Sequence, residues 1–367
     1  MRRVIVFKGE ITAEQPISYS VPGAAKGTDH TLPRIGRHLY LTASGLRGAL
    51  RHAATEIVMD LVDANPDGKK LNLDDYFLLA MGGVKDAKVS AKKGTAEKSA
   101  EDEDGDDAEK SVSDTDIVRM LRANRHVRAH NPLVGLFGSM RHGVSGSLYC
   151  AHALAPEGTE PTRIRYVRSN DFQRDPGVLD RLDESVLDAF IARQADAAER
   201  TDGNNRKKTL EQEKKKLRRE GASERLKEID AEIAAIEAAQ PKDVQLQLPN
   251  ITYQAIPAGT VFSHEFTLSN PTDAEVALLL RALDRFALNP LLGGHRAHGL
   301  GRVSGRWSVR MREQGEREFT EAGEVWFKGD FTGLELTGRI AEFTKVWDAL
   351  VAARDALEFT EAGIAAA

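Results

Sequence analysis

A glycine-rich segment in the last third of the chain carries the densest group of side chains that could bind a ligand. It reads Leu292-Gly-Gly-His-Arg-Ala-His-Gly-Leu-Gly-Arg-Val303. Glycine allows positive φ and lets an anion approach main-chain N–H groups, and arginine offers forked donors that match phosphate oxygens. The segment therefore predicts a phosphate-binding loop, although a simple helix-to-strand turn would need two of its glycines. The candidate residues are Gly293, Gly294, His295, Arg296, His298, Gly299, Gly301 and Arg302.

The loop does not fit the common nucleotide-binding motifs. It lacks the Gly-Lys-Ser/Thr ending of a Walker loop. It is also expected to follow a helix and precede a strand, which is the reverse of the dinucleotide-binding order.

A second basic group lies near the start of a helix in the N-terminal part of the chain. Thr42 or Ser44 can cap this helix, and Arg47 and Arg51 follow four residues apart. Main-chain amides at a helix start favour phosphate, so Ser44 and both arginines are candidate contacts to an anionic backbone. A solvated helix face explains the two arginines equally well.

The elements that must position these residues mix strands and helices. Residues 4–11 and 260–268 have the apolar alternation of strands, and residues 301–310 leave the loop as another strand. Apolar residues at helical spacing predict helices after residue 44 and over 274–288. The strand, helix, glycine-rich loop and strand near the C-terminus echo the strand, loop and helix at the N-terminus, which predicts an α+β fold with a ferredoxin-like core and large insertions.

Composition limits the class of protein. The 367 residues are 41% hydrophobic and 29% charged, enough for one elaborated domain or two modest ones. No apolar run approaches the ~18 residues of a membrane helix, and the N-terminus becomes charged too early for a signal peptide. A single cysteine, Cys150, excludes an internal disulfide and fits a reducing compartment. We therefore expect a cytoplasmic protein without a membrane partner.

The net charge of −5 hides an uneven distribution. Residues 101–110 carry seven acids and one lysine, and the wider segment 85–113 has almost no large apolar side chains. Such a segment is expected to be a disordered insertion. Residues 210–239 read as a charged helical hairpin that restarts at Ser223. A solvated helix pair is favoured there over an arm that binds nucleic acid.

Several segments in order along the chain resemble the CRISPR-associated RAMP proteins. Besides the glycine-rich loop, they are Tyr40-Leu-Thr-Ala-Ser-Gly-Leu-Arg-Gly-Ala-Leu-Arg51, Leu136-Phe-Gly-Ser139, Arg168-Ser-Asn-Asp-Phe-Gln-Arg174 and Ile256-Pro-Ala-Gly-Thr-Val-Phe262. The resemblance covers residues 2 to about 312 and is closest to the backbone subunits that polymerise along a CRISPR RNA. The acidic insertion, helical thumb and extended tail depart from the common subunits, which points to the divergent version of the type IV effector complex.

The resemblance implies a fold, a function and partners. The RRM-type palm would comprise residues 1–84, 114–170 and 251–312, with a helical thumb at 171–250 and a C-terminal extension at 313–367. The protein would bind a crRNA guide through its phosphates, leave the bases free to pair with target nucleic acid, and assemble with further copies and other effector subunits. The loop would pack beside Arg47 and Arg51, and no cofactor or metal is implied. Further RNA contacts would come from Arg168, Asn170 and Arg174.

Catalysis and a protein-only role are the alternatives. Type III relatives cleave RNA with an aspartate in the loop after the first strand, where this chain has Asp29, although loop aspartates usually just form turns. A guide-processing endoribonuclease would use a histidine, yet none is paired in the sequence with a second catalytic group. A scaffold that contacts only proteins is the third hypothesis. We expect a binding subunit rather than an enzyme.

Overall fold

The computed structural model divides the chain into two compact units. Unit 1 contains Met1–Arg163 and Gln254–Ala367, and unit 2 contains Ile164–Tyr253. The predicted acidic insertion at 85–113 lies outside the residues that the structure describes. The described residues are 2–19, 32–64, 70–83, 124–166, 202–215, 217, 223–239 and 251–360.

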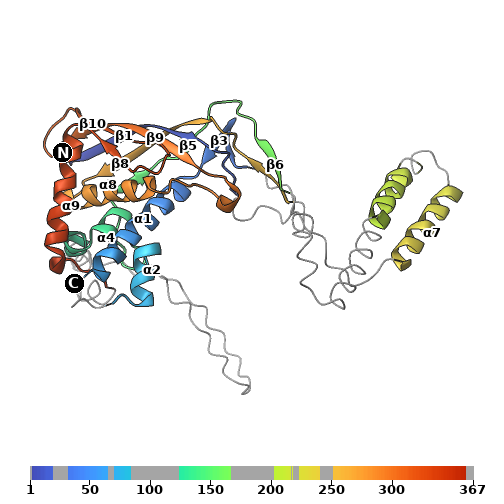
Figure 1. Cartoon of the computed structure of the whole chain (residues 1–367), viewed down its shortest axis with the longest axis horizontal. Helices are drawn as coiled ribbons and strands as arrows, with labels where there is room; N and C mark the ends of the chain where they lie inside the picture. Colours follow the sequence, from blue (N-terminus) through green and yellow to red (C-terminus); the bar gives the residue numbers. More distant parts are fainter. Residues whose placement is uncertain are drawn as a thin grey trace, which may run out of the picture. The chain divides into compact units, whose positions relative to one another are not determined.

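Unit 1 is built on one antiparallel sheet, which Figure 1 shows above the helices. Its described strands follow the order β11-β10-β9-β1-β8-β5-β3-β2, and β4 also pairs with β8. They are β1 (Val4–Ala13), β2 (Arg34–Ile35), β3 (His38–Leu41), β4 (Leu148–Cys150), β5 (Ala153–Leu154), β8 (Val261–Ser269), β9 (Val303–Arg312), β10 (Thr320–Phe327) and β11 (Glu335–Leu336).

Two β-α-β halves form the centre of the sheet. In the first half β1 leads to α1 (Ala43–Asp63) and then to β4 and β5, and in the second β8 leads to α8 (Asp273–Ala287) and then to β9. The first strands of the two halves, β1 and β8, are neighbours at the centre. This is the β-α-β-β-α-β arrangement of ferredoxin-like folds, so the predicted α+β class is confirmed.

Alternation along the strands explains why helices cover one face of the sheet. In β1, Ile5, Phe7 and Ile11 are buried whereas Lys8 and Glu10 are exposed. Helices α1 and α8 pack against each other on the apolar face, and both lie below the sheet in Figure 1. Each fully buried large side chain there stabilises the fold by about 1.5–3 kcal/mol.

The predicted strand over residues 147–154 is broken into β4 and β5. Cys150 pairs with Phe266 and Leu154 with Ser263, so four steps on one strand oppose three steps on β8. The extra residue forms a bulge, which interrupts the ladder.

The apolar piece expected as a turn at residues 132–138 contains a short buried helix, α4 (Pro132–Phe137). The Asn131 side chain caps it by accepting the Val134 N–H at 2.9 Å. Helix α2 (Leu73–Met81) precedes it in the chain, and residues 124–130 are also helical.

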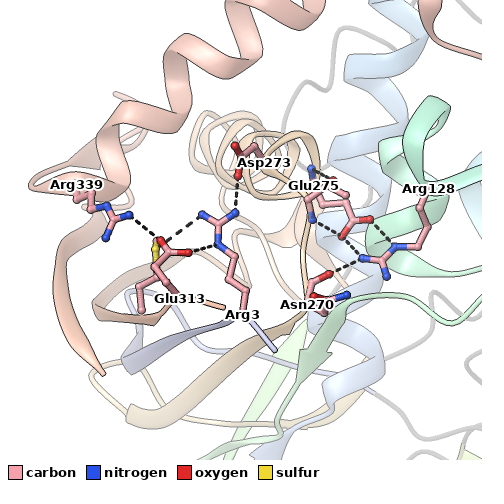
Figure 2. Close-up of polar contacts among 9 residues, drawn as sticks. Arg3, Arg128, Asn270, Asp273, Glu275, Glu313 and Arg339 are labelled. Atoms are coloured by element: carbon pink, nitrogen blue, oxygen red, sulfur yellow. Dashed lines mark hydrogen bonds and ion pairs between the residues drawn. The ribbon is translucent and has the colours of Figure 1, made fainter. Parts of the chain in front are cut away.

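The C-terminal extension belongs to unit 1 and continues its sheet. Strand β10 pairs with β9, and α9 (Phe343–Ala352), which follows the single turns at Arg339–Glu342, packs against α8. Figure 2 shows how this part is tied to the N-terminus: Arg3 forms ion pairs with Asp273 and, at 3.3 Å, with Glu313. Glu313 also pairs with Arg339 at 2.6 Å. Arg3 is mostly buried and Glu313 largely so, which favours a structural role for this cluster.

A second cluster in Figure 2 joins the helical residues 124–130 to the start of α8. Arg128 donates from Nε and Nη2 to the two carboxylate oxygens of Glu275, each at 2.8 Å. Glu275 is fully buried and also completes a capping box with Thr272. A bidentate pair is what a buried carboxylate needs, because an unpaired buried charge is strongly destabilising.

Unit 2 contains the predicted helical hairpin. Residues 202–215 form one helix, and α7 (Ser223–Ala239) restarts at Ser223 as expected. The helices are joined by ion pairs of Lys207 with Glu237 and of Lys214 with Asp230. These charges therefore pair within the hairpin. A separate two-stranded sheet pairs β6 (Thr162–Tyr166) with β7 (Ile251–Ala255).

No helix among the described residues has both the length and the hydropathy required to cross a bilayer.

Candidate functional site

The glycine-rich loop is held against the chain segment that follows β1. The Gly294 N–H donates to the Ser18 carbonyl at 2.7 Å, and the Gly301 N–H donates to the Pro16 carbonyl at 2.9 Å. The Leu292 N–H donates to the Gly301 carbonyl at 2.8 Å and closes the base of the loop. These three amides are therefore used by the fold and are not available to an anion.

Two glycines of the loop are required by this packing. Gly293 has a φ of +83°, and a Cβ there would lie 2.5 Å from the Ser18 carbonyl oxygen. Gly301 has a φ of +93°, and its Cβ would lie 2.2 Å from the Leu292 carbonyl oxygen. Their first role is to allow close approach of two backbones. The turn interpretation therefore accounts for these two glycines.

The tip of the loop is exposed. A single turn, Arg296–His298, sits between His295 and Gly299, both of which have left-handed backbone conformations. The rings of His295 and His298 stack with centroids 5.8 Å apart. Arg296 donates from Nε to the Gly293 carbonyl at 3.1 Å, which fixes the base of its guanidinium.

The loop lies beside α1, but not beside Arg47 and Arg51 as predicted, and a cavity of about 340 Å³ separates the loop from the helix. From α1 the cavity is lined by Gly45, Ala49, His52 and Glu56, which recur every three or four residues and share one stripe. Across it lie Leu291, Leu292, Gly293 and Arg296 of the loop, with Arg285 and Phe286 of α8. The site thus joins elements about 240 residues apart, because the two halves of the fold are adjacent.

Arg47 and Arg51 occupy a different face of α1 from the one expected. Arg51 donates to the Leu79 carbonyl at 2.6 Å, the Leu78 carbonyl at 2.9 Å and the Gly138 carbonyl at 3.3 Å. Burial lowers the pKa of its guanidinium to about 10. Arg47 donates to the Phe137 carbonyl. Neither arginine lines the cavity, because each points to the backbone around α2 and α4.

The charges around the cavity are only partly balanced. Arg285 pairs with Asp60, and His52 lies 3.2 Å from Glu56. Among the described residues, Arg296 forms no ion pair, and neither does Arg302. The Arg302 Nε is buried without a hydrogen-bond acceptor in that part of the chain. Two loop cations without carboxylate partners suit a polyanion.

Tyr19 lies at the wall of the cavity. Its hydroxyl is buried and makes no hydrogen bond to the described residues. Burial first and the nearby Tyr40 second raise the pKa of this phenol, which therefore stays neutral. A buried hydroxyl without a partner costs free energy, so Tyr19 is a destabilising feature among the described residues.

The open face of the sheet has a second hollow, of about 270 Å³, whose lining includes Glu10, Arg306 and Trp326. Its charges alternate: Lys8 lies opposite Glu265, and Glu10 lies opposite Arg306, which pairs with Glu324 at 2.6 Å. The open-face residues of the central strands are Val6, Lys8, Glu10, Ser263, Glu265 and Thr267, with no aromatic among them. RNA-recognition sheets stack bases on aromatic side chains. On this face the aromatic side chains are Tyr149 of β4, which is exposed beside Thr267, and the half-buried Trp326 of β10, which lies opposite Arg306.

A buried polar cluster in the core is unsuited to chemistry. Trp307 Nε1 donates to His264 Nδ1 at 3.2 Å, and Cys150 Sγ lies 3.6 Å from His264 Nε2. Burial lowers the pKa of His264 to about 4 and raises that of Cys150 to about 12. Both side chains are therefore neutral, which makes the thiol a poor nucleophile. The described residues contain no group of three or more His, Cys, Asp or Glu side chains arranged to hold a metal.

The remaining candidates divide into two groups. Ser44 is exposed in the first turn of α1, where Thr42 is the cap and accepts the Gly45 N–H at 3.1 Å. The residues Asp29, Arg168, Asn170 and Arg174 lie outside the described part of the chain.

Sequence reasoning did not select Tyr19, Arg285 or Asn289, which line the cavity. Arg285 breaks the apolar pattern of α8 on the side toward α1, and that break was the available signal. Tyr19 and Asn289 sit in connecting segments, where no periodicity marks a role.

Comparisons with known proteins give little beyond the geometry. No protein-family model matches the sequence, and no curated protein matches it. One chain of a solved structure titled "Type IV-B CRISPR Complex" is similar, with 14% sequence identity and a TM-score of 0.37. The match covers 86% of this chain and 92% of that chain. A likeness of this size does not by itself indicate what the chain binds.

Proposed function

We propose that this chain binds the guide RNA of a CRISPR ribonucleoprotein complex as one of its backbone subunits, and that it is a binding subunit rather than an enzyme. The proposal starts from the ordered segments that resemble RAMP proteins. The ferredoxin-like core supports it, because that fold underlies the resemblance.

The observation that carries the proposal is the position of the loop. The tip with Arg296 lies beside the start of α1, across a cavity that also reaches Arg285. Arg296 has no carboxylate partner among the described residues, and its Nε is fixed by the Gly293 carbonyl. Phosphates of an RNA strand would supply the missing anions, and phosphate contacts leave bases free to pair.

The experiment is purification of the tagged full chain from cells, followed by nuclease treatment and sizing of the RNA that remains. A backbone subunit should retain RNA cut into regularly spaced fragments, since each copy covers a fixed length. Particles without nucleic acid would overturn the proposal and favour a protein-only scaffold. Specific cleavage of a repeat RNA by the chain alone would instead favour an endoribonuclease.

A matched pair of variants connects the result to the loop. Arg296→Glu should reduce RNA retention at least about tenfold, because it replaces a phosphate contact by a like charge. Arg281→Glu is the control: Arg281 is an exposed arginine of α8, one turn from Arg285, and it does not line the cavity. Equal retention by both variants would exclude the loop as the binding surface.

A further inference from the structure

The wall of the cavity contains a glycine that the fold does not require. Gly48 lies inside α1 and lines the cavity, and a Cβ placed on it would meet nothing within 4 Å. Glycine inside a helix is about 1 kcal/mol less favourable than alanine. Since no described contact explains Gly48, its effect is to leave the helix backbone bare toward the cavity. Bare backbone is what a ligand needs for close approach.

The rest of the wall mixes apolar groups with the charged and polar side chains of His52, Glu56, Arg285 and Arg296. Leu46 and Ala49 contribute from α1, Phe286 from α8 and Leu292 from the loop. A cavity of about 340 Å³ is at the lower end of the range for small-molecule sites. A bare glycine surface flanked by aliphatic and aromatic groups suits the face of a flat ring, and the cations Arg285 and Arg296 suit a phosphate beside it.

Two polar side chains without hydrogen-bond partners in the described part of the chain also line the cavity. The Tyr19 hydroxyl is buried without a hydrogen-bond partner among the described residues. The Asn289 side chain is exposed at the rim, and its amide can both donate and accept. That combination matches the edge of a base, which presents donors and acceptors side by side.

We propose that this cavity holds one base of the bound single-stranded RNA, with Arg296 contacting a phosphate beside it. The inference rests on the proposed function and adds the part of the ligand that enters the site. The base lies against the helix backbone at Gly48, its edge meets Asn289, and Tyr19 forms part of the surrounding wall. The test must distinguish an RNA base from the chain's own residues 20–31, which follow Tyr19 in the sequence, as the occupant of the cavity.

The test compares two RNA probes on the full chain. One is a short single-stranded oligoribonucleotide, and the other has the same length and backbone but no bases. Gly48→Leu fills the cavity at a position with free space, and Asn289→Ala removes only an exposed amide. Ala349→Leu, on the exposed side of α9, is the control for an added side chain on a helix. Affinity and melting temperature are measured for each protein.

The wild-type chain should bind the base-bearing probe about tenfold more tightly than the abasic one. Gly48→Leu should abolish that difference without lowering the melting temperature or the affinity for the abasic probe. Asn289→Ala should reduce the difference, and Ala349→Leu should preserve it.

Three other outcomes would overturn either the base pocket or the proposed function. Equal wild-type affinity for both probes would overturn the base pocket but leave RNA binding intact. No binding of either probe would overturn the proposed function itself. A lower melting temperature in Gly48→Leu, with equal loss for both probes, would overturn the base pocket, because the added side chain would then disturb the fold or displace residues of the chain itself.

Discussion

Replacing Arg51 by methionine tests whether this arginine stabilises the fold or contacts RNA. Its guanidinium donates three hydrogen bonds, at 2.6, 2.9 and 3.3 Å, to carbonyls of Leu79, Leu78 and Gly138. Two of these carbonyls are in the last turn of α2, where a cation also offsets the negative end of the helix dipole. The guanidinium carbon of Arg51 also lies 5.7 Å from the ring centroid of Phe137.

The expected loss of unfolding free energy follows from these contacts. A hydrogen bond to a charged group contributes about 1.5–3 kcal/mol when fully buried. The side chain is partly exposed, so water can replace some of the loss after substitution. Arg51→Met should therefore destabilise unit 1 by about 2–3 kcal/mol. Arg281→Met, which removes only an exposed ion pair, should change stability by less than about 0.5 kcal/mol.

Urea denaturation followed by tryptophan fluorescence measures this difference. The three tryptophans, Trp307, Trp326 and Trp347, all belong to unit 1, so the signal reports that unit alone. RNA affinity of Arg51→Met, measured well below its melting temperature, should equal that of the wild type. Unchanged stability with a clear loss of RNA affinity would refute the reasoning, because Arg51 would then be a phosphate ligand.

Three further predictions follow from the buried groups and the loop. The pKa of His264 is about 4 in the folded chain and about 6.5 in the unfolded one. Above pH 6.5 the histidine is neutral in both states, so its titration does not reduce the free energy of unfolding. Between those two pH values only the unfolded state binds the extra proton, so the free energy of unfolding should fall by about 1.4 kcal/mol per pH unit as the pH decreases. Urea denaturation at several pH values should show a shallower fall for His264→Gln. An equal slope for the variant and the wild type would contradict the assignment of this pH dependence to His264. Gly301→Ala should destabilise by at least about 2 kcal/mol in thermal melting, since its φ is +93° and its Cβ would overlap the Leu292 carbonyl, whereas Gly299→Ala, which has free space, should cost about 1 kcal/mol from φ alone. Glu275→Gln should lower stability by about 3–5 kcal/mol in the urea assay, because it breaks a buried bidentate pair with Arg128; a loss below about 1 kcal/mol would show that the amide replaces the carboxylate.

The sequence predicted the parts of the fold that have clean periodicity. Residues 260–268 alternate without interruption and form β8, and the apolar stripe from Leu46 to Ile57 fixes the buried face of α1. Strand β10 was not predicted, because a register shift between Glu321 and Gly323 breaks its alternation. A bulge leaves no period-2 pattern to recognise.

The site was predicted in part. Glycine and arginine content located the loop, and the ferredoxin-like order placed it beside α1. The partners of Arg47 and Arg51 could not be predicted, because they are main-chain carbonyls near α2 and α4. Which stripe of α1 faces the loop is decided by how α8 packs, and no local pattern encodes that. The buried hydroxyl of Tyr19 likewise becomes significant only once its surroundings are known.

The most direct measurement of the central claim is the salt dependence of RNA binding by the wild-type chain and by Arg296→Ala. For single strands, each phosphate contact contributes about 0.7 to the slope of log affinity against log salt concentration. Arg296→Ala should therefore lower the slope by about 0.7, whereas Arg281→Ala should leave it unchanged. An identical slope for wild type and Arg296→Ala would contradict phosphate binding by the loop.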